Sequence, residues 1–306
     1  MAAAIYGDIS MRQFSDLDIF IKENDIERAR AVLLSLGYRP DPDHQLDFEA
    51  HYISENNRFI IDLHWAFSFK DIRRKRDVSF EFDLEGIWER MGQIAFLESM
   101  IAQFSKEDMF IIRCQDAVKE YWKDPWPKLI WVHDIAQMIQ VHAEMDWEWV
   151  VWKANQSKSQ RLISLCLSLA ENLIGTPLPE MVRSRIQLDK QVKVLMKQAC
   201  RMFYDEDEAQ NPFLDKHHGF LRRELFCIRL KESFKDRIPY YFRMLRRYRT
   251  NACRAVKNKE ERGLLLLPDP LSFLYYLFIV LYYILRPLWR TSRLGSRMLN
   301  SELTQK

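Results

Sequence analysis

The stretch SMRQFSDLDIFIKEN, residues 10–24, places two aspartates, Asp16 and Asp18, one residue apart in a hydrophobic run. In a β-strand the side chains of residues i and i+2 point to the same face, so the two carboxylates would lie side by side and repel each other. A divalent cation such as Mg²⁺ or Mn²⁺ prefers oxygen ligands, leaves room for phosphate oxygens and would stabilise such a pair. The alternative interpretation is a solvated turn at the start of a strand, without any ligand.

A third acid stands in an apolar setting further along the chain. Asp62 lies within IIDLHW, residues 60–65, where an unpaired carboxylate would be costly to bury. If its strand lies beside the strand of Asp16 and Asp18, three carboxylates converge on one cation site, as metal-assisted phosphoryl or nucleotidyl transfer requires. His64 would face the same side as Asp62. The alternative for His64 is a partly buried histidine that bonds a backbone group.

The residues between these acids carry signals for one helix and two strands. Asn24 with Glu27 three residues later is typical of a capping box, and Gly37 is typical of a helix end, so the sequence predicts a helix between them. A polar, proline-containing loop is expected next. The segments DFEAHYIS (47–54) and RFIIDLHWAF (58–67) flank a short polar turn and predict a hairpin. The expected order is therefore strand, helix, strand, strand.

The rest of the chain has the periodicity of helices. Apolar residues recur at three- and four-residue spacing in four segments, namely 82–91, 106–122, 126–145 and 157–175. Strands early in the chain and helices later indicate an α+β fold class. We expect a small α/β domain with a mixed sheet over residues 1–75 and a mostly helical domain over residues 76–306, with the boundary near the basic stretch KDIRRKRD (70–77).

Composition describes an ordinary globular protein. The chain has 306 residues, of which 48% are hydrophobic, and a net charge of +3, which is too small to indicate a general nucleic-acid binder. Its five cysteines are scattered and form no C-x-x-C pair, which argues against a disulfide framework and a zinc site. The segment MAAAIYGDIS lacks the basic start and long apolar stretch of a secretory signal. We therefore expect a cytoplasmic protein.

Several segments together resemble the uncharacterised nucleotidyltransferase family of the polymerase-β-like superfamily. The strongest similarity lies in AAAIYGDISMRQFSDLDIFI, in the helix end LLSLGY and in IIDLHW. The later segments KLIWVHDIAQM and LYYILRPLWR are similar more weakly. The resemblance implies a nucleotidyltransferase-type α/β domain followed by helices.

The resemblance also implies site residues and a reaction. Arg12, Asp16, Asp18, Asp62 and His64 fall on family motif positions. The three aspartates are then expected to bind Mg²⁺ or Mn²⁺, Asp62 to act as the base, Arg12 to steady phosphate and His64 to lie on the substrate side. The expected activity is transfer of a nucleoside monophosphate from a nucleoside triphosphate to an unknown hydroxyl-bearing acceptor. The alternative is a catalytically inactive binding protein with the same fold.

Two features depart from the family pattern. The resemblance implies a glycine turn before the strand of Asp18, and we expect this chain to lack it, because Met1 stands where that turn should end. A histidine-glycine-x-lysine-histidine stretch of the family is replaced by CQDAVKEYW, which keeps only Lys119. Lys119 is either a phosphate-binding point charge or a solvated surface lysine.

The C-terminal third is basic and then apolar. Residues 216–262 contain 15 Lys and Arg against 5 Asp and Glu, which suits nucleic acid, anionic lipid or nucleotide phosphates, although amphipathic helices with a solvated basic face are the favoured interpretation. The run LSFLYYLFIVLYYIL, residues 271–285, would reach only about 22 Å as a helix, less than a bilayer core of about 30 Å. It is either a packed core helix, which we favour, or a peripheral membrane contact.

Overall fold

The computed structural model describes residues 2–67, 70–71, 76–77, 83–96, 98–123, 128–204 and 225–242. The chain divides into two compact units, 1–234 and 235–306. Of the second unit, residues 235–242 are described, and they are helical. The apolar run 271–285 and most of the basic stretch lie outside the described residues. Among the helices that are described, none has the length and apolar character needed to cross a bilayer.

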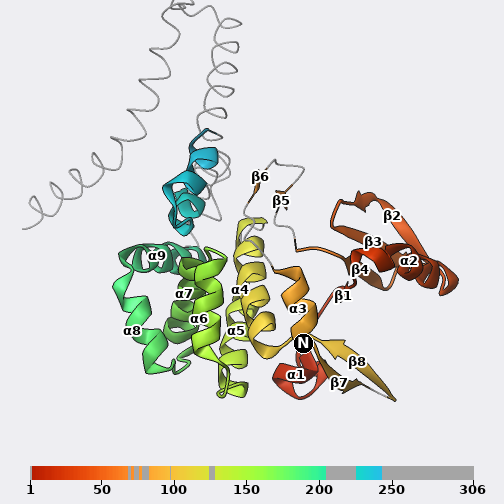
Figure 1. Cartoon of the computed structure of the whole chain (residues 1–306), viewed down its shortest axis with the longest axis horizontal. Helices are drawn as coiled ribbons and strands as arrows, with labels where there is room; N and C mark the ends of the chain where they lie inside the picture. The colour runs from red at the N-terminus through yellow and green to blue at the C-terminus, as the bar shows by residue number, and fades with distance from the viewer. Residues whose placement is uncertain are drawn as a thin grey trace, which may run out of the picture. The chain divides into compact units, whose positions relative to one another are not determined.

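The first unit begins with an α/β portion (Figure 1). A short helix and a 3-10 turn precede the first strand, and a second 3-10 turn leads into the helix that packs on the sheet. Their bounds are α1 Ala2–Tyr6, η1 Ile9–Met11, β1 Leu17–Phe20, η2 Glu23–Asp25, α2 Ile26–Ser35, β2 Tyr38–Gln45, β3 Glu49–Ser54 and β4 Ile60–His64. The expected order of strand, helix, strand, strand is present as β1, α2, β3 and β4, and β2 is an additional strand between α2 and β3.

A helical portion follows, and the α+β class is confirmed. Two short ladders accompany the helices, and α7 continues into a π-helix. The bounds are β5 Lys70–Asp71, β6 Arg76–Asp77, α3 Leu84–Arg90, β7 Gly92–Phe96, β8 Ser99–Gln103, α4 Lys106–Lys123, α5 Leu129–Val141, α6 Trp147–Gln156, α7 Gln160–Leu169, η3 Ala170–Ile174, α8 Glu180–Leu188 and α9 Lys190–Tyr204. Residues 225–230 and 234–242 are also helical.

The four longer strands form one mixed sheet in the order β1-β4-β3-β2. β1 runs parallel to β4, whereas β3 is antiparallel to both of its neighbours. The register places Asp18 opposite Asp62 on β4, and Asp62 opposite His51 on β3. Two residues further along β4, His64 lies opposite Glu49. Polar residues thus share rows across three strands.

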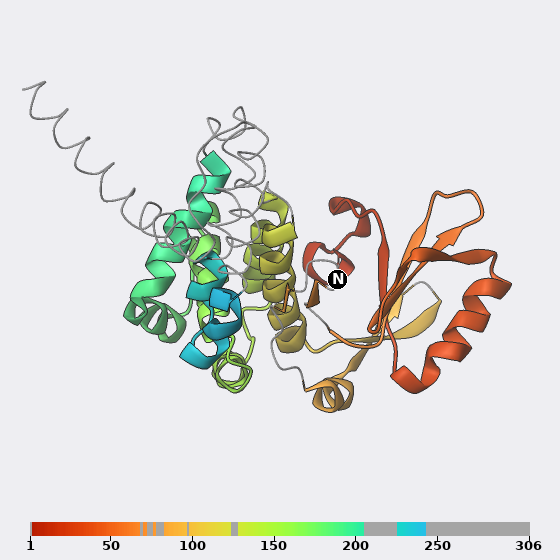
Figure 2. The same cartoon turned by 90° about the horizontal axis from the view of Figure 1, so that it is seen from above.

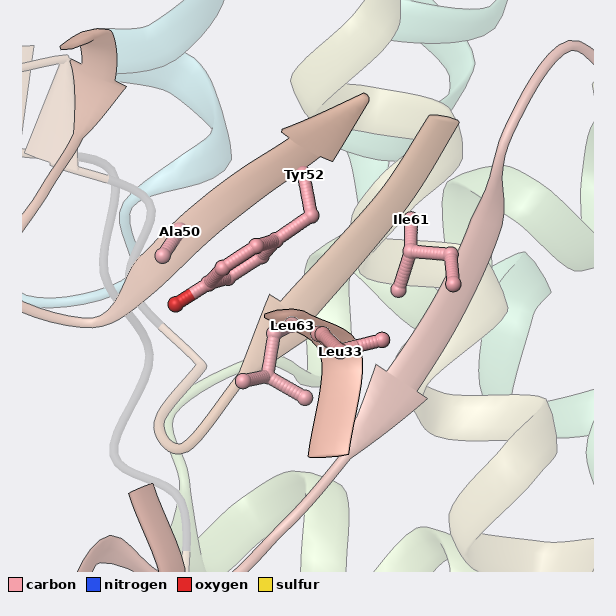
Figure 3. Packing of buried hydrophobic residues seen from close by; sticks show 5 residues of the cluster. All are labelled: Leu33, Ala50, Tyr52, Ile61 and Leu63. Carbon is pink, nitrogen blue, oxygen red and sulfur yellow. The ribbon is translucent and has the colours of Figure 1, made fainter. Parts of the chain in front are cut away.

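One face of this sheet packs on α2, which lies alongside the strands in Figure 2. The contact is a small hydrophobic core, drawn in Figure 3, made by one residue of α2 and alternate residues of β3 and β4: Leu33, Ala50, Tyr52, Ile61 and Leu63. Because side chains alternate along a strand, the residues between these project from the opposite face. We call that opposite face the acid face, with Asp18, Glu49, His51, Asp62 and His64 as its members.

Two local expectations differ from the structure. The proline-containing segment expected to be a loop forms β2, an edge strand, where proline is tolerated because one row of N–H groups needs no partner. The capping box at Asn24 is also wrong: the chain makes η2 there, and α2 begins at Ile26 without a side-chain cap. Gly37 does end the helix, with φ at 83°. The boundary expected near residue 75 stays a prediction.

Candidate metal site on the acid face

Asp62 occupies the centre of the acid face and is nearly buried, with 9% of its surface exposed. Its Oδ2 lies 3.5 Å from Nε2 of His51. Its Oδ1 is buried and has no hydrogen-bond partner. Burial raises the pKa of Asp62 to about 6, and the negative charges of Asp16 and Asp18 add to this effect. A buried carboxylate oxygen without a partner, next to other carboxylates, is the environment that a bound cation would stabilise.

His64 lies between two carboxylates of the acid face. Its Nε2 is 2.9 Å from Oδ1 of Asp18, and its Nδ1 is 3.3 Å from Oε2 of Glu49. One potential ligand atom each from Asp18, Asp62 and His64 lies within 4.8 Å of the others. Two carboxylates, one of which has a buried oxygen without a partner, fit Mg²⁺ or Mn²⁺, which take oxygen ligands. His64 orients Asp18 and is itself oriented by Glu49.

Asp16 is positioned differently from the expectation of two aspartates on one strand. β1 begins at Leu17, so Asp16 lies in the bend before the strand and is exposed. The hydroxyl of Ser15 donates a hydrogen bond to Oδ1 of Asp16 at 3.3 Å. Asp16 is close enough to raise the pKa of Asp62. It is not one of the three residues whose ligand atoms cluster within 4.8 Å.

Arg12 makes a bifurcated hydrogen bond with a buried aspartate of α5. Its Nε lies 3.0 Å from both carboxylate oxygens of Asp134, which is fully buried. The Tyr6 hydroxyl donates to the same carboxylate at 2.6 Å, and Arg113 donates through Nη2 at 2.7 Å. Arg12 also donates through Nη1 to the carbonyl of Gln13 at 3.1 Å. Asp134 therefore fixes the segment that leads into β1.

Comparison with known proteins gives a family. The model of a family described as uncharacterised nucleotidyltransferase matches residues 1–175, more than half of the chain. This protein belongs to that family. Neither a search of curated proteins nor a search of solved structures found a match. The matched range contains the whole acid face together with Arg12 and Asp134.

The site residues expected from the sequence are brought together to different degrees. Asp18, Asp62 and His64 cluster on the acid face, and Asp16 stands at its margin. Arg12 contacts Asp134 rather than any of these acids in the hydrogen bonds described above. Lys119 lies in α4, but its side chain is outside the described residues.

Three polar residues of the network were missed by sequence reasoning. Glu49 and His51 alternate with Ala50 and Tyr52 in β3, so the hairpin expected there already placed them opposite β4. Asp134 stands in an apolar helical segment, which is the signal that had singled out Asp62. In each case the residue was visible, but its partner depended on the tertiary fold.

Proposed function

We propose that this nucleotidyltransferase family member transfers a nucleoside monophosphate from a nucleoside triphosphate to a hydroxyl-bearing acceptor, with Mg²⁺ or Mn²⁺ as the cofactor. The observation that carries the proposal is the pairing of Asp18 with Asp62 across β1 and β4, together with the buried Oδ1 of Asp62 that lacks a partner. Family membership supplies the reaction class. The acid face supplies the residues.

Asp16, Asp18 and Asp62 would hold the cation. When bound, the metal would offset the charge of the triphosphate and of the leaving pyrophosphate. Asp62 is the proposed base: with a pKa of about 6 it is mostly ionised at neutral pH and accepts the proton of the acceptor hydroxyl. The acceptor oxygen then bonds to the α-phosphorus, the bond between the α-phosphorus and its bridging oxygen breaks, and pyrophosphate leaves.

The remaining residues have supporting roles in the proposal. His64 keeps the Asp18 carboxylate in one orientation through its 2.9 Å contact and lies on the substrate side. Arg12 would meet a phosphate oxygen through Nη2, for which no hydrogen bond is seen within the described part of the chain. Lys119 is proposed as a second phosphate-binding cation.

The second candidate is a binding protein that keeps the fold without transfer activity. The contact between Arg12 and Asp134 favours this alternative, because Nε and Nη1 of Arg12 are already bonded to protein oxygens. A guanidinium shared in this way would bind a triphosphate more weakly than one that faces the ligand alone. Such a protein would bind nucleotide or metal and release no pyrophosphate.

Pyrophosphate release separates the two candidates. The assay combines each nucleoside triphosphate with Mg²⁺ or Mn²⁺ and a broad pool of hydroxyl acceptors. We expect release by the wild type and its loss in Asp62→Asn, since the amide cannot accept the proton. Asp25→Asn is the matched control, because Asp25 is an exposed carboxylate at the start of α2, on the other side of the sheet.

Calorimetric titration with non-hydrolysable nucleotides completes the test. Nucleotide binding that survives in Asp62→Asn while release is lost supports the enzyme. Nucleotide binding without any release above the Asp62→Asn background favours the binding protein. Absence of nucleotide binding, of metal binding and of pyrophosphate release refutes both candidates.

A further inference from the structure

A second group of metal-binding side chains lies where β2 departs from regular pairing with β3. Pro40 pairs with Tyr52 and Gln45 pairs with Ala50, so residues 41–44 of β2 stand opposite His51 alone. Such a bulge redirects side chains and is frequent beside functional sites. Here it brings two residues of β2 over one residue of β3.

Asp41 and His44 are the two residues brought to His51. His44 Nδ1 lies 2.7 Å from Oδ2 of Asp41. The imidazole rings of His44 and His51 are stacked with their centroids 4.7 Å apart and their planes within 3°. One ligand atom from each of the three residues lies within 4.8 Å of the others.

The bulge holds these side chains in place by hydrogen bonds. The backbone N–H of Asp43 donates to Oδ1 of Asp41 at 3.1 Å, which leaves Oδ2 on the side of His44. The Gln45 side-chain amide donates to the Asp41 carbonyl at 3.0 Å and to the His51 carbonyl at 3.3 Å. Gln45 therefore ties the bulge of β2 to β3, and the three side chains keep their mutual arrangement.

We propose that Asp41, His44 and His51 bind a transition-metal ion, with Zn²⁺ as the first choice. Two imidazoles and one carboxylate form a donor set that suits Zn²⁺, Ni²⁺ or Cu²⁺ better than Mg²⁺. The His44 side chain is 42% exposed, so an ion can enter and the fourth position is open to water. Local hydrogen bonding alone accounts for the contact of Asp41 with His44, but it does not account for the second imidazole stacked beside them.

This second site would touch the acid face through one residue. His51 Nε2 lies 3.5 Å from Oδ2 of Asp62. A metal on His51 would restrict its ring and thereby the orientation of the Asp62 carboxylate, as an outer-shell partner does for a ligand. The proposal of the metal site does not depend on nucleotidyl transfer, since its test needs no nucleotide.

Cobalt binding provides the direct test, because Co²⁺ in a nitrogen and oxygen site absorbs visible light and Zn²⁺ displaces it. The background protein is the full chain with Asp18→Asn and His64→Asn, which removes one proposed ligand of the acid face and the histidine that orients it. We expect this protein to develop one visible band that saturates near one equivalent of Co²⁺ and disappears on addition of Zn²⁺. No band at excess Co²⁺ would refute the site.

Two substitutions and one control locate the metal. In the same background, His44→Ala and Asp41→Ala should each weaken Co²⁺ binding by at least about tenfold, the lower end of the effect of losing even an outer-shell partner. Asp43 lies in the same bulge, and Asp43→Ala should change Co²⁺ affinity only slightly. If all three variants bind Co²⁺ with the affinity of the background protein, and their circular dichroism is unchanged, the metal lies elsewhere and the proposal is overturned.

Discussion

Replacing Asp62 by asparagine should stabilise the metal-free protein at neutral pH, even though it removes the proposed base. The pKa of Asp62 is raised from its ordinary value of 3.8 to about 6 by burial and by the charges of Asp16 and Asp18. The folded state therefore binds this proton more tightly than the unfolded state does. The stability that the protonated carboxyl provides is fully present below pH 3.8 and is lost as the pH rises through about 6.

The magnitude follows from the same two pKa values. Their difference corresponds to about 3 kcal/mol at 25 °C, because one pKa unit is worth about 1.4 kcal/mol. An asparagine is neutral at every pH and avoids this loss. Its advantage over Asp62 should be small near pH 4 and should approach about 3 kcal/mol at pH 7, as an upper value.

Urea unfolding in the presence of EDTA, repeated at several pH values, measures this difference. Mn²⁺ at one hundred times its Kd should then cancel most of this difference, since it stabilises the folded wild type by about 2.7 kcal/mol and the variant binds it poorly. The control Asp25→Asn removes an exposed carboxylate away from the acid face, and its difference from the wild type should show no comparable pH dependence. An Asp62→Asn variant less stable than the wild type at pH 7 in EDTA, or a difference independent of pH, would show that the ionised Asp62 does not destabilise the fold.

Four further outcomes are expected. Mn²⁺ should raise the melting temperature of the wild type, and Asp18→Ala should remove most of that rise in differential scanning fluorimetry; an unchanged rise would place the metal outside the acid face. Asp134→Ala should lower the free energy of unfolding by about 3–5 kcal/mol in urea, because it leaves Arg12 and its neighbours without their buried partner; a loss below about 1 kcal/mol would contradict this. Gly37→Ala should cost about 1–2 kcal/mol in the same assay, since φ is 83° there; a neutral effect would show that the turn relaxes. If residues 271–285 form a packed helix, as we favour from the sequence, the full chain should not float with anionic liposomes, and salt-sensitive flotation would indicate a peripheral membrane contact instead.

The strands that carry the candidate site could be predicted because their alternation is unambiguous. Asp18 and Asp62 stand in apolar strands, and the register of a parallel pair then places them in one row. β2 was missed because two prolines in YRPDPDHQ interrupt the alternation of polar and apolar residues. An edge strand can form without that alternation. The hairpin of β7 and β8 was missed for a different reason, since a short ladder inside a helical region has no strong signal of its own.

Side-chain partners were less predictable than strands. The sequence indicated Arg12 as a phosphate ligand by resemblance, yet its Nε is 3.0 Å from both oxygens of Asp134, more than one hundred residues away. No local pattern encodes such a pair, because it depends on how α5 packs near the turn before β1. The cluster of Asp41, His44 and His51 depends in the same way on a bulge that only the pairing of β2 with β3 reveals.

The helical portion contributes no acid to the candidate metal site, yet the position of the site on the sheet makes the helical portion matter to it. The core with α2 holds Ile61 and Leu63 on one face of β4, so Asp62, which lies between them, points to the acid face. The segment before β1 lacks this support, since Asp16 is exposed and lies outside the strand. Its fixed points are Tyr6 and Arg12, and both bond the buried carboxylate of Asp134 in α5. The helical portion therefore determines where Asp16 stands relative to Asp18 and Asp62, and a change at Asp134 should weaken metal binding on the acid face without removing any of its ligands.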